Sequence, residues 1–169
     1  MNTKLNGKTV IYALLALLVL IFVIGSFRAS HRLGTGLAFD RFMTTTGLSS
    51  ADWEAMSPDR KESVISDVRT KAIPSAALRS VSSLCLGLLA LVSVAYTFRE
   101  RMFTRLNSTL MGIALSALAG LSSGAATVSL TNNSGAWYGA VGIAILSFLL
   151  FYLLTGILAL FRKFAVPRG

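Results

Sequence analysis

Residues 120–124 read Gly-Leu-Ser-Ser-Gly, which matches the G-x-S-x-G pattern around the nucleophile of many serine hydrolases. In that chemistry the serine follows a β-strand, and a histidine takes the proton of its hydroxyl. The surroundings of Ser122 are predicted to be helical, and the only histidine, His31, lies in a distant segment. We therefore predict no catalytic residue, and we expect that the protein is not an enzyme.

Residue types that bind metals or carry redox chemistry are equally sparse. His31 has no second histidine and no neighbouring cysteine, so the sequence predicts no metal site and no cofactor. Cys85 is the only cysteine, which excludes an internal disulfide and a relay between paired thiols. Single side chains therefore indicate no catalytic or metal-dependent function, and the hydrophobic segments of the chain are more informative.

The composition is that of a membrane protein. Hydrophobic residues make up 54% of the chain and charged residues only 14%, against about 25% charged in ordinary soluble domains. Four uncharged segments reach the roughly 18 residues that a membrane span requires: 9–27, 81–98, 108–130 and 137–161. The first is longer than the apolar part of a signal peptide and lacks a clear cleavage site, so we expect it to be retained. The predicted fold is an all-α integral membrane protein with four transmembrane helices.

Basic residues predict the orientation of these helices. The link 99–107 and the tail 162–169 are basic, whereas the short link 131–136 carries no charge. Cytoplasmic loops are enriched in lysine and arginine, so we expect both basic segments, and the N-terminus 1–8, to be cytoplasmic. The segment 28–79 then forms an extracytoplasmic helical loop. The expected location is the cell's inner or plasma membrane, with several crossings.

The formal net charge of +9 fits this topology. Basic residues near the ends of spans attract anionic lipid headgroups, so a bilayer with such headgroups is an expected partner. A nucleic-acid partner would require a basic face on a folded soluble domain, which this chain lacks. We predict no nucleic-acid binding.

The segment 28–79 is predicted to contain two short amphipathic helices near the outer surface. One begins after Ser49 or Ser50, and the other after Ser57, with Pro58 in its first position. Glycines make 34–47 flexible at both ends, and Pro74 is expected to interrupt the chain before it re-enters the membrane. The region is either a cap packed on the bundle or a docking surface for a partner. The docking candidates are Trp53, Met56, Val64, Ile65 and Val68.

Small residues recur four apart along the third span, on one face of the predicted helix. Because lipid gives helices no hydrophobic reason to associate, such residues favour close helix packing, and we expect this helix to be central. The fourth span offers matching small residues. The stripe is either a packing seam or the lining of a pore, and the absence of charge in the spans favours the seam. The predicted packing residues are Ser108, Gly112, Ser116, Gly120, Gly124, Gly139, Ala140 and Ala144.

These features predict a non-enzymatic function. The leading hypothesis is a small subunit or assembly partner of a membrane complex, which contacts another membrane protein or a second copy of itself. A membrane immunity or phage-exclusion protein is one alternative, from size and topology alone. An oligomeric channel or holin-like pore is the other.

Overall fold

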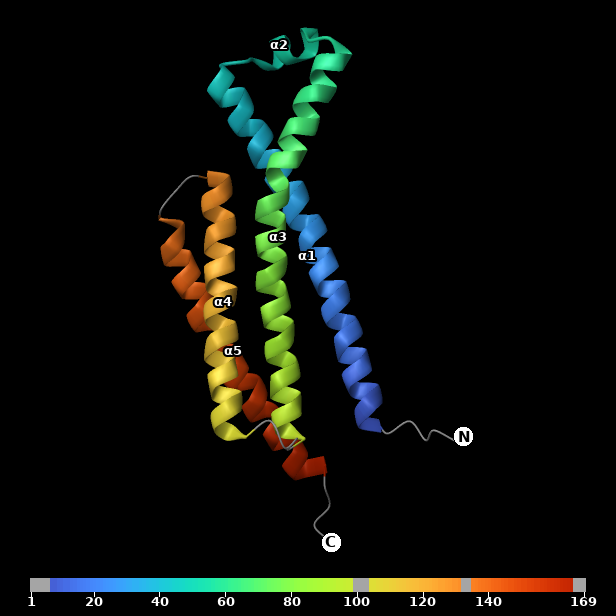
Figure 1. Ribbon diagram of the computed structural model, residues 1–169, viewed down its shortest axis with the longest axis vertical. Helices are drawn as coiled ribbons and strands as arrows, with labels where there is room; N and C mark the ends of the chain where they lie inside the picture. The colour runs from blue at the N-terminus through green and yellow to red at the C-terminus, as the bar shows by residue number, and fades with distance from the viewer. Residues whose placement is uncertain (1–6, 99–103, 132–134, 166–169) are drawn as a thin grey trace, which may run out of the picture.

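The structure, a computed structural model, describes residues 7–98, 104–131 and 135–165. Every element in these ranges is an α-helix, as predicted, and four of the helices are long and apolar enough to cross a membrane. In chain order the helices are α1 (Gly7–Thr46), α2 (Ser50–Ala55), α3 (Pro58–Thr97), α4 (Arg105–Thr131) and α5 (Ala136–Ala165) (Figure 1). Most of the predicted basic link 99–107, part of the link 131–136 and the ends of both terminal segments lie outside the described residues.

The spans are helical because lipid offers no hydrogen bonds to a polypeptide backbone. A helix pairs its N–H and C=O groups within one segment, which makes it stable in the bilayer. Several hydroxyl groups within the spans follow the same rule. Ser93 Oγ donates to the carbonyl oxygen of Leu89 at 2.9 Å, and Ser147 Oγ donates to that of Ile143 at 2.7 Å. Serine and threonine are therefore compatible with these membrane helices.

The central helix of the bundle is α3. It packs against α1, α4 and α5, whereas α1 lies at the edge and packs mainly on α3 (Figure 1). The third span, α4, also packs between α3 and α5 as expected, but α3 has the more extensive contacts. The physical reason is that the membrane half of α3 carries small residues on several sides, which lets neighbours approach from more than one direction. Those buried there are Ser82, Ser83, Gly87, Ser93 and Ala95.

Both α1 and α3 continue beyond the membrane part of the bundle. Each has 40 residues, which corresponds to about 60 Å of helix. Their outer parts and α2 together form a projection that we call the stalk (residues 28–79). Figure 1 shows that α1 and α3 cross and then diverge, with α2 joining their outer ends. Of the two predicted short helices, the first is present as α2, whereas the second is the beginning of the 40-residue α3.

Two local expectations fail because the long helices run on without a break. The segment 34–47 is helical up to Thr46, and α3 runs through Pro74. Gly34 fits the α1–α3 crossing because a Cβ there would lie only 3.2 Å from Ala72 Cβ. Pro74 removes one backbone hydrogen bond, and proline inside a helix kinks it. Packing between the two helices therefore outweighs the local preferences of glycine and proline.

The turns at the tip of the stalk follow their sequence signals. Gly47 has a φ of +66°, and Leu48 N–H donates to Met43 O at 3.2 Å, as in a Schellman termination of α1. Ser49 caps α2 in a reciprocal capping box with Asp52. The predicted start of α3 is confirmed, with Ser57 at the N-cap and Pro58 at the first position.

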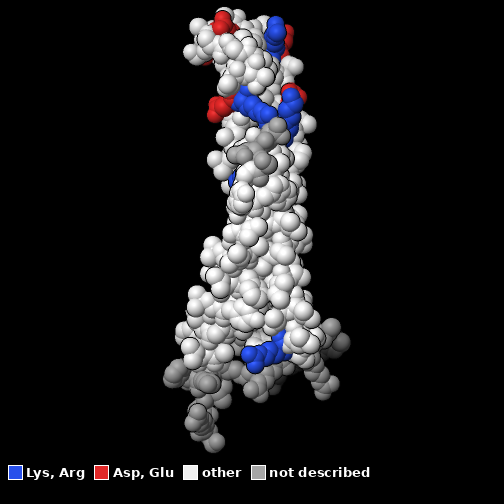
Figure 2. Space-filling view, turned by 90° about the vertical axis from the view of Figure 1, so that its left-hand side faces the viewer, with Lys and Arg blue, Asp and Glu red and all other residues white. Residues whose placement is uncertain are grey.

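Charged side chains gather at separate levels of the molecule. In the view of Figure 2, Lys and Arg lie on the stalk and near the opposite end, with a long uncharged stretch between them. Acidic residues lie on the stalk, towards its tip. The uncharged stretch corresponds to the membrane-crossing parts of the helices.

Candidate functional sites: the helix seams and the stalk

The small-residue stripe of α4 lies against α5. A Cβ added at Gly120 would lie 2.5 Å from the carbonyl oxygen of Ala140 and 2.8 Å from Ala144 Cβ. One added at Gly124 would lie 2.6 Å from Ala140 Cβ. The backbones of α4 and α5 therefore approach so closely at this point that only glycine fits on α4. We call this contact the α4–α5 seam.

The rest of the stripe is also buried. Ser108 and Ser116 are 3% and 2% exposed, and a Cβ at Gly112 would meet the ring of Phe151 at 2.8 Å. Within the described chain, the hydroxyl oxygens of Ser108 and Ser116 have no hydrogen-bond partner. The stripe thus faces the interior of the bundle along its whole length.

On α5 the contact surface differs in part from the predicted set. Ala140 is buried and Ala144 is half-buried, but Gly139 is exposed, and a Cβ there would meet nothing within 4 Å. Gly139 therefore does not belong to the seam. The buried residues of α5 continue instead with Ser147 and Phe151. Their positions after Ala140 and Ala144 follow the three- and four-residue steps of one helix face, a signal that a search for glycine and alanine alone passes over.

A second seam joins α1 to α3 and was not predicted. A Cβ at Gly87 would lie 2.5 Å from Val19 Cγ1, so α1 and α3 approach closely there. Ser83 Oγ also donates to Ser26 Oγ at 2.6 Å, which adds a hydrogen bond between the two helices. The signal was present in the small residues of the span 81–98.

Further hydrogen bonds join the other helix pairs. Ser82 Oγ on α3 donates to Ala119 O on α4 at 3.0 Å. Thr155 Oγ1 on α5 donates to Ser93 Oγ on α3 at 3.2 Å. Within a bilayer such bonds contribute on average about 0.6 kcal/mol each. Hydroxyl groups and close packing therefore act together to hold α3 to its neighbours.

The candidate nucleophile Ser122 and the only histidine, His31, lie on different helices, and each makes its own contacts. Ser122 Oγ donates to Leu118 O at 2.8 Å within its own helix. His31 lies on the stalk, where its Nε2 is 3.3 Å from Arg69 O and its ring stacks on Phe27. Nothing in the described chain groups three or more metal-binding side chains. These positions support a packing role for Ser122 and a structural role for His31 between α1 and α3.

The predicted docking residues differ in exposure. Trp53, Met56, Val64 and Ile65 are half-buried, whereas Val68 is only 2% exposed. Val68 is part of the contact between α1 and α3 and is not available to a partner. Trp53 packs edge-to-face on Phe39 of α1, with ring centroids 4.9 Å apart. These side chains thus serve first to hold the tip of the stalk together.

The tip is also held by polar contacts. Lys61 Nζ on α3 donates to Glu54 O on α2 at 2.9 Å. Hydrogen bonds from the hydroxyl and backbone N–H of Ser49 lower the pKa of the Asp52 carboxyl from its usual 3.8. The Glu54 carboxylate forms a long ion pair of 4.0 Å with Lys61 Nζ, and its side chain is 83% exposed. The tip is therefore an ordered helical turn with exposed acidic side chains.

Comparisons with protein-family models, curated proteins and solved structures gave no match for this chain.

Proposed function

We propose that the protein is a non-enzymatic membrane subunit that presents the stalk to another protein. The observation that carries this proposal is the continuity of α1 and α3, which extend from the membrane bundle into the stalk without a break. Two helices anchored in the bilayer hold the tip at a fixed place above it. Such an arrangement suits recognition at a distance from the membrane.

The α4–α5 seam supports packing over conduction. The close approach of Gly120 and Gly124 to α5 fills the face of α4 that a pore would require to be open. The lipid-facing sides of α4 and α5 are bulky and apolar, with Leu118, Leu121 and Leu149 about half exposed. The membrane bundle thus anchors the protein, and the stalk contacts the protein partner.

The proposed orientation places the stalk outside the cytoplasm. Figure 1 shows that α1 begins and α5 ends at the same end of the bundle, opposite the stalk. In the sequence, the basic segments 99–107 and 162–169 adjoin the helix ends found there, and such residues favour the cytoplasmic side. A Glu54→Cys variant in a Cys85→Ala background tests this. An impermeant maleimide should label intact cells; labelling only after lysis would reverse the orientation.

Site-specific photo-crosslinking tests the partner. A photoreactive residue at Glu54, in the full chain in native membranes, should give one discrete adduct. The same residue at Leu149, which is 58% exposed on α5, is the matched control and should give lipid adducts only. An adduct of twice the chain mass would identify self-association. Identical products from both positions would contradict a role for the tip.

A further inference from the structure

We infer that the cleft between α1 and α3, at the base of the stalk, binds the headgroup phosphate of an anionic phospholipid. The cleft is lined by residues of α1, α3 and α4, and Figure 1 shows that α1 and α3 diverge beyond their crossing. Its volume is about 430 Å³, and the last turn of α4 closes it on one side through Ser129 and Leu130. Small-molecule sites of proteins have volumes of about 300–1,000 Å³.

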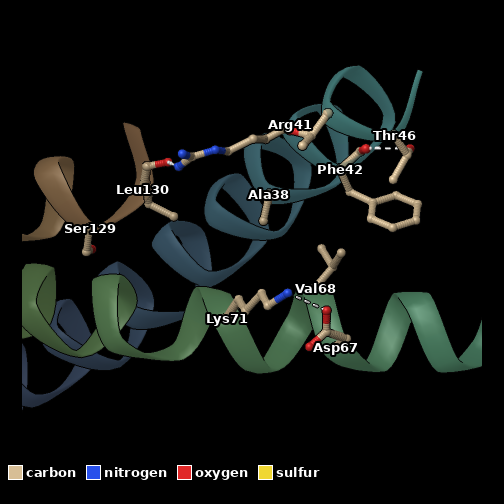
Figure 3. A pocket seen from close by; sticks show the side chains of 10 residues that line it. Ala38, Arg41, Phe42, Thr46, Asp67, Val68, Lys71, Ser129 and Leu130 are labelled. Carbon is tan, nitrogen blue, oxygen red and sulfur yellow. Dashed lines mark hydrogen bonds and ion pairs between the residues drawn. The ribbon is translucent and has the colours of Figure 1, made fainter. Parts of the chain in front are cut away.

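Two cations enter this cleft from different helices. Arg41 extends from α1 and Lys71 from α3, and Figure 3 shows both side chains at the cleft. Arg41 Nη1 donates to Leu130 O at 3.3 Å, which holds the guanidinium over the end of α4. The remaining N–H groups of a guanidinium can donate to phosphate oxygens in a bidentate manner. Arg41 is therefore positioned for an anion.

Lys71 is paired with Asp67 in a way that leaves it free to bind a second acceptor. Its Nζ lies 2.6 Å from Asp67 Oδ2, but the side chains are 67% and 56% exposed. An ion pair this exposed is weak, and an ammonium group has two further donors. With Arg41, these groups give the cleft an excess of positive charge, which complements a phosphate.

Apolar side chains also line the cleft, beside the hydroxyl-bearing Thr45, Thr46 and Ser129. Ala38 and Phe42 line it from α1, whereas Val68 on α3 is only 2% exposed and adds little surface. A free phosphate ion would gain nothing from these side chains, whereas the glycerol and upper acyl chain of a phospholipid would contact them. Cations beside apolar walls therefore favour a lipid over a soluble phosphate.

The position of the cleft along the membrane normal is consistent with a phospholipid headgroup. Its floor is the end of α4, and α5 begins nearby in sequence with Trp137 and Tyr138, which are 43% and 86% exposed. Exposed tryptophan and tyrosine are typical of the boundary between lipid and water. Lys71 lies two helical turns, about 12 Å, beyond Arg79 along α3. The cleft thus falls in the headgroup layer, where anionic phosphates are concentrated.

Lipid binding to the full-length protein in detergent tests the site. Phosphatidylglycerol, phosphatidylcholine and soluble glycerol phosphate are titrated against the wild type and against the double variant Arg41→Gln/Lys71→Gln, with native mass spectrometry as the readout. The control is Arg60→Gln/Arg105→Gln, which removes the same charge away from the cleft. Thermal unfolding without lipid checks that both variants are folded.

We expect the wild type to prefer phosphatidylglycerol, and the Arg41/Lys71 double variant to bind it at least about tenfold more weakly, with the control unchanged. Equal losses in both variants would mean general surface attraction and overturn the site. Equal affinity for phosphatidylcholine would overturn the preference for an anionic lipid. Equal affinity for glycerol phosphate would identify a soluble phosphate as the ligand and overturn the lipid.

Discussion

Gly120 lies directly against the backbone of Ala140, so that a Cβ on Gly120 would come within 2.5 Å of the Ala140 carbonyl oxygen. A backbone oxygen in the middle of a helix cannot rotate away as a side chain can. The relationship therefore fixes the distance between α4 and α5 at a value that only glycine permits. It also closes the face of α4 that a pore would use.

Gly120→Ala should destabilise the protein by about 1–3 kcal/mol, the usual cost of overpacking. Gly142→Ala on α5 is the control, because a Cβ there would meet nothing within 4 Å. Unfolding midpoints of the two variants in the same detergent measure the difference. If both midpoints match that of the wild type, the seam is looser than described.

Gly87→Ala should destabilise the contact of α1 with α3, because its new methyl group would overlap Val19. Valine is stiff at χ1 in a helix, so Val19 cannot turn aside. Val19→Ala creates the missing space. The double variant Val19→Ala/Gly87→Ala should therefore be more stable than the sum of the single changes, with a coupling of about 0.5–3 kcal/mol. Strict additivity in a double-mutant cycle would argue against the contact.

Ser82→Ala should cost about 0.6 kcal/mol through loss of its hydrogen bond to Ala119 O. Ser129→Ala is the control, since among the described residues Ser129 Oγ donates to Ala126 O within its own helix and to no other helix. The free energy of unfolding in mixed micelles separates the two. A larger effect at Ser129 would mean that bonds between helices are not what these hydroxyl groups contribute.

The number and type of the membrane helices could be read from the sequence, because a span must be long, apolar and uncharged. The start of α3 was also readable, since Ser57 and Pro58 act locally. The small residues of α4 were readable as a face, and so were Ala140 and Ala144 as their partners on α5, but Gly139 was wrongly included. Gly139 is one residue from Ala140, and one residue turns a helix by about 100°, which removes Gly139 from the contact.

The stalk could not be derived from local signals. Glycine at positions 34 and 36 and proline at 74 are helix breakers in isolation, and they favour short separate helices. In the structure, the contact of Gly34 with Ala72 and Ser75 turns a weak helical position into a crossing point. The central place of α3 likewise depends on which of several small-residue faces meet, and this is a property of the assembled bundle.

The Asp52 carboxyl should titrate below pH 3.8, because Ser49 donates hydrogen bonds to its charged form. A carboxyl whose pKa is lowered by folding adds stability above its unfolded pKa, and this stability is lost as pH falls through the folded pKa. The cap of α2 should thus persist at neutral pH and weaken as the pH falls below 3.8. In Ser49→Ala the pKa should return towards 3.8, as followed by carboxyl chemical shifts; an unchanged titration would contradict the capping box.

The height of the tip above the bilayer tests most directly whether α1 and α3 form a standing stalk. A fluorophore at Glu54→Cys, in a Cys85→Ala background, is compared in liposomes with one at Tyr138→Cys, using energy transfer to labelled headgroups. The helix from Lys71, at the level of the cleft, to Pro58 predicts that the Glu54 position lies about 20 Å from the headgroup plane, with the Tyr138 position close to it. Equal transfer from both positions would place α2 on the membrane surface and contradict the stalk.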